Sequence, residues 1–108
     1  MPQQEIQDCF VLADLKQLMK QSSPDQFIII DVRNLDEYAE KHIPGAINFP
    51  LYELENRTKV LSLQTIIITA CGKGGGRSAQ AAELLQRMGF SNAKFLCGGT
   101  FGWYDVYK

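Results

Sequence analysis

Several features are scarce in this chain of 108 residues, and each absence excludes a class of protein. No apolar run approaches the roughly 18 residues that a membrane-spanning helix needs. Eleven lysines and arginines against twelve acidic residues give a net charge of −1, which offers nucleic acid no bulk attraction. The first residues, MPQQEIQD, lack the basic-then-apolar order of a secretory signal. We therefore expect a cytoplasmic protein with no nucleic-acid or membrane partner.

Cysteine and histidine are also scarce, with three and one in the chain. An odd number of cysteines, Cys9, Cys71 and Cys97, argues against a framework of disulfide bonds. The sequence has no C-x2-C or cysteine–histidine pair, and His42 stands alone, so no metal site is expected. Any special role for a cysteine is therefore expected to be redox or nucleophilic chemistry.

The length and the ordinary composition of the chain predict one globular domain over residues 1–108. The apolar, β-branched segments Phe27–Val32 and Thr65–Ala70 predict strands buried on both faces, as in a parallel sheet. Helical spacing of apolar residues predicts helices over Leu12–Gln21 and Ser78–Met88.

Shorter segments complete an alternation of strands and helices. Asn34 and Glu37 have the spacing of a capping pair, which predicts a helix from Leu35 to about Lys41. Further elements are expected at Ala46–Phe49 and Ala93–Leu96 (strands), within Leu51–Leu63 (a short helix) and within Thr100–Tyr107 (a last helical turn or two). The fold class is therefore α/β, with a central, mostly parallel sheet and helices on both faces.

The loop Cys71–Arg77, CGKGGGR, joins the second buried strand to a helix. Ligands of open α/β sheets bind at this position, beyond the carboxyl ends of the strands. Free amides of the helix near Ser78 and of a glycine-rich loop can form an anion-binding cradle, and Lys73 and Arg77 add positive charge. These features favour the thiolate of Cys71, which is the nucleophilic form. The loop glycines are Gly72, Gly74, Gly75 and Gly76.

The same loop has a simpler interpretation, because such loops also bind phosphate without covalent chemistry and buried cysteines are commonly inert. The Walker pattern is absent, since Lys73 is followed by glycine, and a dinucleotide G-x-G-x-x-G fails because residue 77 is arginine. The spacing therefore favours a nucleophilic Cys71.

Three groups of residues, in this order, resemble the rhodanese-like (thiosulfate sulfurtransferase) family over most of the chain. They are Asp31-Val32-Arg33 with Glu37-Tyr38 and HIPGAINFP (42–50), the loop Cys71–Arg77 with Ser78, and Gly98-Gly99 with Trp103. The resemblance implies a single domain whose central parallel sheet has about five strands.

By that resemblance, Cys71 would take a sulfane sulfur from a small anionic donor such as thiosulfate and become a persulfide. It would then pass the sulfur to a thiophilic acceptor, either cyanide or a protein thiol. The residues that would bind the donor and the persulfide are Gly72, Lys73, Gly74, Gly75, Gly76, Arg77 and Ser78. No metal or organic cofactor is implied.

The length of the loop departs from the family's usual pattern. Single-domain sulfurtransferases usually have C-x4-R, whereas this chain has C-x5-R. The longer loop is similar to that of cell-cycle phosphatases and arsenate reductases of the same fold, although those usually have histidine where this chain has Ala70. Sulfur transfer is the first interpretation; phosphatase or arsenate reductase chemistry and a non-catalytic binding or regulatory module are the alternatives.

Asp31 and Arg33 are candidate supporting residues at the edge of the sheet that carries Cys71. We interpret Asp31 as tying down the turn, with shaping of the pocket as the alternative. Arg33 is expected to pair with Glu37, or else to present its charge to an anionic donor. His42 is expected to be structural.

The sequence also suggests roles for two aromatic residues near the C-terminus and for the two remaining cysteines. Trp103 and Phe101 are expected to close the core. For Cys97 the hypothesis is a resolving thiol or second sulfur carrier for Cys71, against the favoured alternative of a small buried side chain. No role is expected for Cys9. The glycine-rich loop is expected to tighten when an anion binds.

Overall fold

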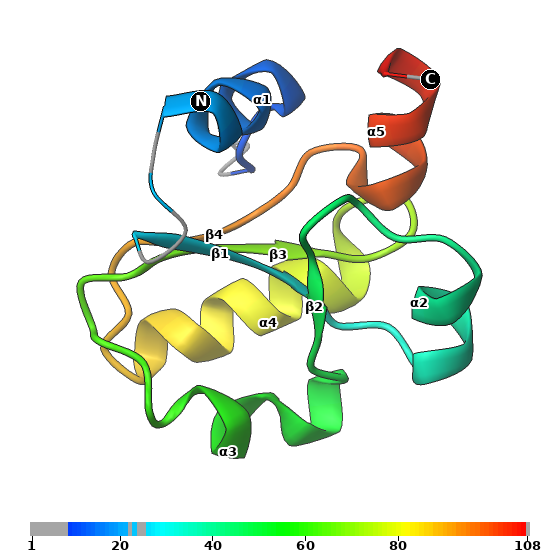
Figure 1. Cartoon of the computed structure of the whole chain (residues 1–108). Helices are drawn as coiled ribbons and strands as arrows, with labels where there is room; N and C mark the ends of the chain where they lie inside the picture. Colours follow the sequence, from blue (N-terminus) through cyan, green and yellow to red (C-terminus); the bar gives the residue numbers. More distant parts are fainter. Residues whose placement is uncertain (1–8, 22, 24–25, 108) are drawn as a thin grey trace, which may run out of the picture.

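A parallel sheet between two layers of helices forms the fold (Figure 1). The computed structural model describes residues 9–21, 23 and 26–107. The strands are β1 (Phe27–Asp31), β2 (Ile47–Asn48), β3 (Ile66–Ala70) and β4 (Ala93–Phe95), in the order β2-β1-β3-β4. The prediction of an α/β fold with a parallel sheet is confirmed.

The described residues contain four strands, one fewer than the approximate number implied by the resemblance. Phe10 lies beside the end of β4 and makes a single isolated parallel bridge to Leu96. The chain enters a helix at Leu12, so the pairing ends before a strand can form.

The two isoleucine-rich strands form the centre of the sheet, as predicted. β1 and β3 pair along their whole length, from Phe27↔Ile66 to Asp31↔Ala70. Branched side chains suit a pleated surface that is covered on both faces, and Ile30, Ile67 and Ile68 are fully buried.

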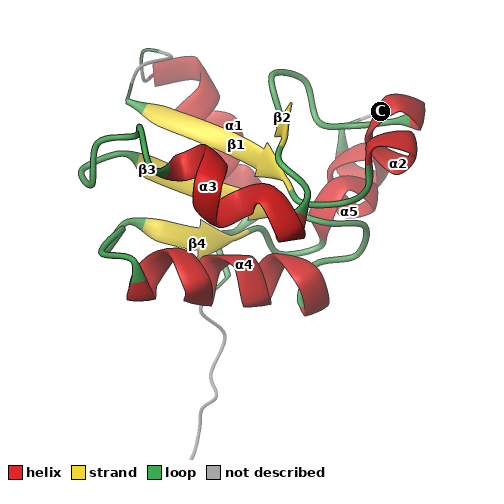
Figure 2. Ribbon diagram, turned by 90° about the horizontal axis from the view of Figure 1, so that it is seen from below, coloured by secondary structure: helices red, strands yellow, loops and turns green. Residues whose placement is uncertain are grey.

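Helices cover both faces of this sheet (Figures 1 and 2). The helices are α1 (Leu12–Gln21), α2 (Leu35–Glu40), α3 (Leu54–Thr58), α4 (Gly76–Arg87) and α5 (Gly99–Val106), with a 3-10 turn at Leu51–Glu53. Leu15 of α1 and Trp103 of α5 pack on one face of the sheet, whereas Leu54 of α3 and Leu85 of α4 pack on the other. None of the helices in the described residues is long and apolar enough to cross a bilayer.

A disulfide bond joins Cys9 to Cys97 and corrects what the sequence suggested. The odd number of cysteines argued against disulfides, Cys9 was expected to have no role, and Cys97 was expected either to be inert or to serve Cys71. The parallel bridge at Phe10 explains the pairing. The Phe10 N–H donates to Phe95 O (2.7 Å) and the Cys97 N–H to Phe10 O (2.9 Å), which brings the two cysteine Cα atoms to 5.1 Å.

Candidate active site

Cys71 directly follows β3, at the carboxyl edge of the sheet, and α4 begins five residues later at Gly76. Figure 2 shows the arrows of β1 and β4 pointing toward the end of the molecule where α2 and α5 lie. Asp31 ends β1 opposite Ala70, so the two chain segments meet at one edge, as the sequence indicated. Cys71 is the free cysteine of the described residues, and its side chain is 5% exposed.

The loop curls around the sulfur atom of Cys71. Gly74, Gly75 and Gly76 have φ values of 85°, 71° and 48°, in the left-handed region that favours glycine. The thiol Sγ lies 3.1 Å from the Gly75 carbonyl oxygen and 3.2 Å from Ser78 Oγ. Ser78 is fully buried and donates to the same Gly75 oxygen (2.9 Å). The sulfur therefore points into its own loop, although the groups bonded to it here are a carbonyl and a hydroxyl.

Backbone amides at the start of α5 donate hydrogen bonds to carbonyl oxygens of this loop. The Thr100 N–H donates to Cys71 O (2.8 Å), and the Phe101 N–H donates to Gly72 O (2.9 Å). Gly99 lies so close that a Cβ there would be 2.6 Å from both Cys71 O and the Gly74 nitrogen. The Gly98-Gly99 pair thus forms a turn and also allows the backbone at Gly99 to approach the backbone of the Cys71 loop closely.

Phe101 does not close the core, so that expectation is wrong, whereas Trp103 does and is 4% exposed. The Phe101 side chain is 47% exposed. Its ring lies against Gly72, where an added Cβ would be 3.1 Å from the ring. An aromatic ring of α5 therefore lies over Gly72, the first glycine of the Cys71–Arg77 loop, because the backbone hydrogen bond from Phe101 to Gly72 holds it there.

Arg77 forms a bidentate ion pair with Glu37 of α2, through Nη1–Oε1 (2.9 Å) and Nη2–Oε2 (3.2 Å). Hydrogen bonds from Arg77, and next from the Asn34 backbone, lower the pKa of Glu37 to about 2. The pKa of Arg77 is raised, first by its hydrogen bond to Glu37 and less strongly by the charges of Glu37, Cys71 and Asp31. The expected pairing of Arg33 with Glu37 is wrong, because Arg77 occupies the carboxylate.

Arg33 instead pairs with Asp31, and both side chains are buried, at 3% and 0% exposure. The Arg33 Nη2 lies 2.8 Å from Asp31 Oδ2, and the Asp31 carboxylate also accepts the Arg33 backbone N–H (3.0 Å). The hydrogen bonds to Asp31 raise the pKa of Arg33. This is the arrangement that the turn-tying interpretation of Asp31 predicts, and burial withholds the Arg33 charge from a donor in solvent.

His42 contacts two tyrosines, one from α2 and one from α5. Its ring stacks on that of Tyr38, with centroids 3.9 Å apart, and its Nδ1 lies 2.8 Å from Tyr38 O. The His42 carbonyl accepts the hydroxyl of Tyr104 (2.6 Å). Among the described residues, no group of three or more His, Cys, Asp or Glu side chains could hold a metal ion.

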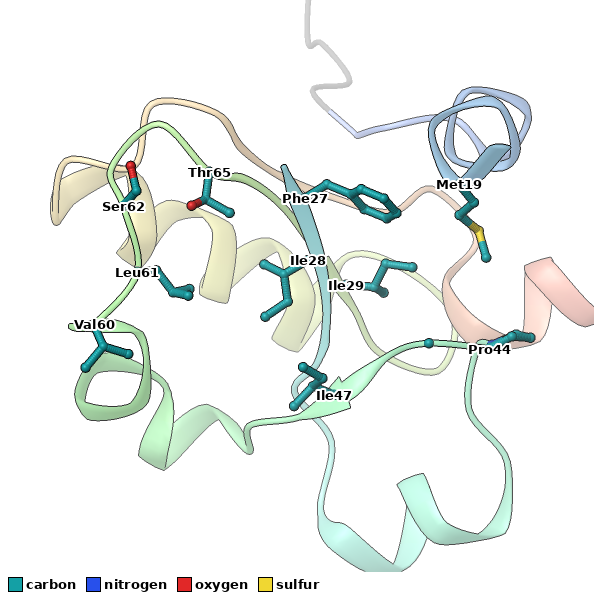
Figure 3. A pocket seen from close by; sticks show the side chains of 11 residues that line it. Met19, Phe27, Ile28, Ile29, Pro44, Ile47, Val60, Leu61, Ser62 and Thr65 are labelled. Atoms are coloured by element: carbon teal, nitrogen blue, oxygen red, sulfur yellow. The ribbon is translucent and has the colours of Figure 1, made fainter. Parts of the chain in front are cut away.

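An apolar cavity of about 640 Å³ lies elsewhere, against β1 (Figure 3). Its lining includes Phe27, Ile28 and Ile29 of β1 together with Ile47 and Leu61, and no residue of the Cys71–Arg77 loop. The cavity exists because β2 pairs only with Ile30 and Asp31, the last two residues of β1. The first part of β1 therefore has no neighbouring strand on that side. The sequence did not predict it.

Comparisons with known proteins agree with this geometry. The model of the Rhodanese-like domain matches residues 11–105. YrkF of Bacillus subtilis (strain 168) is 34% identical over 84 residues, which cover 78% of this chain and 45% of YrkF. The thiosulfate sulfurtransferase PspE of Escherichia coli (strain K12) is 37% identical over 67 residues, which cover 60% of this chain and 64% of PspE. The chain thus spans less than two thirds of the length of either relative.

Solved structures show the same fold. The crystal structure of the BH2092 protein from Bacillus halodurans superposes with a TM-score of 0.79 at 35% identity, over 91% of this chain and 72% of that one. The similarity therefore extends through nearly the whole described chain.

Proposed function

Because the chain belongs to the rhodanese-like domain family, we propose that it is a sulfurtransferase that carries a sulfane sulfur on Cys71. The observation that supports this most is the placement of Cys71. Its free thiol points into a glycine-rich loop between a buried strand and a helix, with Arg77 at the rim. PspE, a relative by sequence, is a thiosulfate sulfurtransferase.

The proposed reaction has two displacement steps on sulfur. The Cys71 thiolate attacks the outer sulfur of thiosulfate, a new S–S bond forms, and sulfite leaves with the electron pair of the broken S–S bond. The terminal sulfur of the persulfide is then attacked by cyanide or by the thiolate of an acceptor protein. The Cys71 thiolate leaves in that step, so the enzyme returns to its initial state.

Residues around the sulfur would stabilise charge in both steps. Ser78 Oγ, 3.2 Å from Sγ, can turn its hydroxyl from Gly75 O to the thiolate. Arg77 and the exposed Lys73 would bind the oxyanion of the donor, together with loop amides that turn inward in the anionic state. Asp31 and Arg33 act only indirectly, by fixing the turn after β1.

Intact-mass measurement tests this proposal directly. Incubation with thiosulfate should add about 32 Da, the mass of one sulfur atom, and cyanide should remove it with formation of thiocyanate. The variant Cys71→Ser should gain no mass. A protein that stays unmodified by thiosulfate and by other sulfane donors would contradict the proposal.

The seven-residue loop specifically favours a second candidate, phosphatase or arsenate reductase chemistry at the same cysteine. Its wider ring suits a tetrahedral oxyanion. Hydrolysis of an aryl phosphate, or thiol-dependent reduction of arsenate, without any loading of sulfur would favour this candidate. If neither turnover nor sulfur loading occurs and the loop still binds anions, the domain is a binding or regulatory module.

The cytoplasmic location is part of the proposal, and the disulfide provides its test. Disulfides persist in oxidising compartments and are generally reduced in the cytosol. A protein that works in the cytoplasm should therefore carry Cys9 and Cys97 as thiols in rapidly quenched cells. Recovery of the intact disulfide would instead place the protein in an oxidising compartment.

A further inference from the structure

The ion pair between Glu37 and Arg77 links α2 to the first turn of α4 across 40 positions of the sequence. Its side chains are 39% and 41% exposed, so the pair lies at the surface, at the rim of the catalytic loop. Ion pairs this exposed add little to the stability of a fold. The geometry therefore points to a role in the site.

Glu37 is itself held in place. Its Oε1 accepts the backbone N–H of Asn34 (3.1 Å) as well as Arg77 Nη1. Asn34 follows Arg33, whose buried pair with Asp31 fixes the end of β1. The carboxylate is thus anchored to the sheet through the start of α2, and it can hold the Arg77 guanidinium in one orientation.

This orientation leaves one edge of the Arg77 guanidinium open. Glu37 binds Nη1 and Nη2, whereas a guanidinium carries five N–H groups. Within the described residues no acceptor is bonded to Arg77 Nε. The Nε–H and the second N–H of Nη2 form a flat fork that matches two oxygens of an oxyanion. The charge of Cys71 contributes to the raised pKa of Arg77, so this guanidinium lies within electrostatic range of the sulfur.

We propose that Glu37 is a positioning residue, which holds the guanidinium of Arg77 so that its open edge receives the oxyanion of the sulfur donor. This inference rests on the proposed function, and it concerns donor binding rather than bond breaking. It also makes a prediction opposite to that of simple electrostatics. The negative charge of Glu37 repels an anionic donor, so its removal would tighten donor binding if charge alone mattered.

Steady-state kinetics with thiosulfate and cyanide distinguish the two effects. Glu37→Gln keeps the size of the side chain and one carbonyl oxygen but removes the charge and the bidentate pair. We expect its KM for thiosulfate to rise about fivefold while kcat stays near the wild-type value. Glu37→Asp, which keeps the charge, should restore part of the affinity. A KM that is unchanged or lower in Glu37→Gln would overturn the role of Glu37.

Glu83→Gln provides a matched control. On the same helix as Arg77, Glu83 Oε1 lies 3.6 Å from Arg87 Nη1. The side chains of Glu83 and Arg87 are both more than 60% exposed. Removing this second glutamate–arginine pair should leave both kinetic constants unchanged, because it touches neither Arg77 nor the loop.

Alkylation of Cys71 tests Glu37 without sulfur transfer. With Cys9 and Cys97 oxidised, Cys71 is the reactive thiol, and the ratio of its rates with iodoacetate and iodoacetamide measures the attraction of an anion. This ratio should fall about fivefold in Glu37→Gln and should not fall further when Glu37→Gln is added to Arg77→Met. An unchanged or higher ratio in Glu37→Gln overturns the role of Glu37, whereas a wild-type protein without thiosulfate activity overturns the proposed function.

Discussion

At the scale of single residues, the Cys71–Arg77 loop is supported by Gly99, which lies outside the loop. Its φ of 62° and its contacts with Cys71 O and the Gly74 nitrogen leave no space for a side chain. Gly99→Ala should therefore lower the free energy of unfolding by about 3 kcal/mol, from backbone strain and overpacking together. Sulfur transfer should fall as the loop shifts. Chemical denaturation and thiosulfate assays measure the two effects.

Gly45→Ala is the control for that substitution. Gly45 has a φ of 87°, but an added Cβ there would meet nothing within 4 Å. It should cost only the strain of a left-handed alanine, about 1 kcal/mol, and leave activity intact. Equal losses in the two variants would show that the contact of Gly99 with the loop has no energetic weight.

Single residues also show where sequence reasoning succeeds and where it fails. The strand–loop–helix pattern around Cys71 was readable because the residues that define it are neighbours in the chain. The partners of Arg77 and Phe101 were not, because each contact joins segments that only the folded sheet brings together. Glu37 belonged to the motif that suggested the family. Its closeness in sequence to Arg33 suggested an ion pair between these two residues, whereas Glu37 pairs with the distant Arg77.

At the scale of elements, α2 and α4 are joined by a charge pair that titrates. The folded-state pKa of Glu37 is about 2, below its ordinary value near 4.5. The carboxylate therefore contributes stability that is small, because solvent screens the exposed pair, but that is fully present above about pH 4.5 and is lost as the pH falls toward 2. The difference in unfolding midpoint between the wild type and Glu37→Gln should be constant from pH 7 to 5 and should shrink below pH 4.5.

A difference between two proteins is the suitable measurement, because the pH dependence that the two proteins share cancels in the subtraction. A difference that stays constant down to pH 2.5 would mean that the Arg77 pair does not favour the ionised form of Glu37. Salt should reduce the difference at neutral pH, since the pair is partly exposed.

The elements themselves were largely predictable, because local patterns determine them. The first helix was placed at its observed bounds, Leu12–Gln21, and the two isoleucine-rich strands within one residue. The start of α4 at Gly76 was missed by two residues, because three consecutive glycines carry no helical periodicity and the helix begins with a residue at positive φ.

At the scale of the whole molecule, the least predictable feature is the bond between Cys9 and Cys97, which lie 88 positions apart. No periodicity relates the two residues. Their meeting depends on the chain passing beside the end of β4 at Phe10, a single bridge that is too short to give a strand-like pattern. The sequence therefore argued against disulfide bonds and gave Cys9 no role, and both expectations were wrong.

The disulfide encloses most of the chain, so its reduction should weaken the whole fold. Closing a loop of this length restricts the unfolded chain, and its loss should lower the free energy of unfolding by about 2–4 kcal/mol. Urea denaturation with and without a reductant measures this. The double variant Cys9→Ser/Cys97→Ser should match the reduced wild type and ignore the reductant. Equal stability of the oxidised and reduced proteins would mean that the Phe10–Leu96 bridge is enough to hold the segment before α1 against β4. It would also mean that Gly99 supports the Cys71 loop without help from the disulfide.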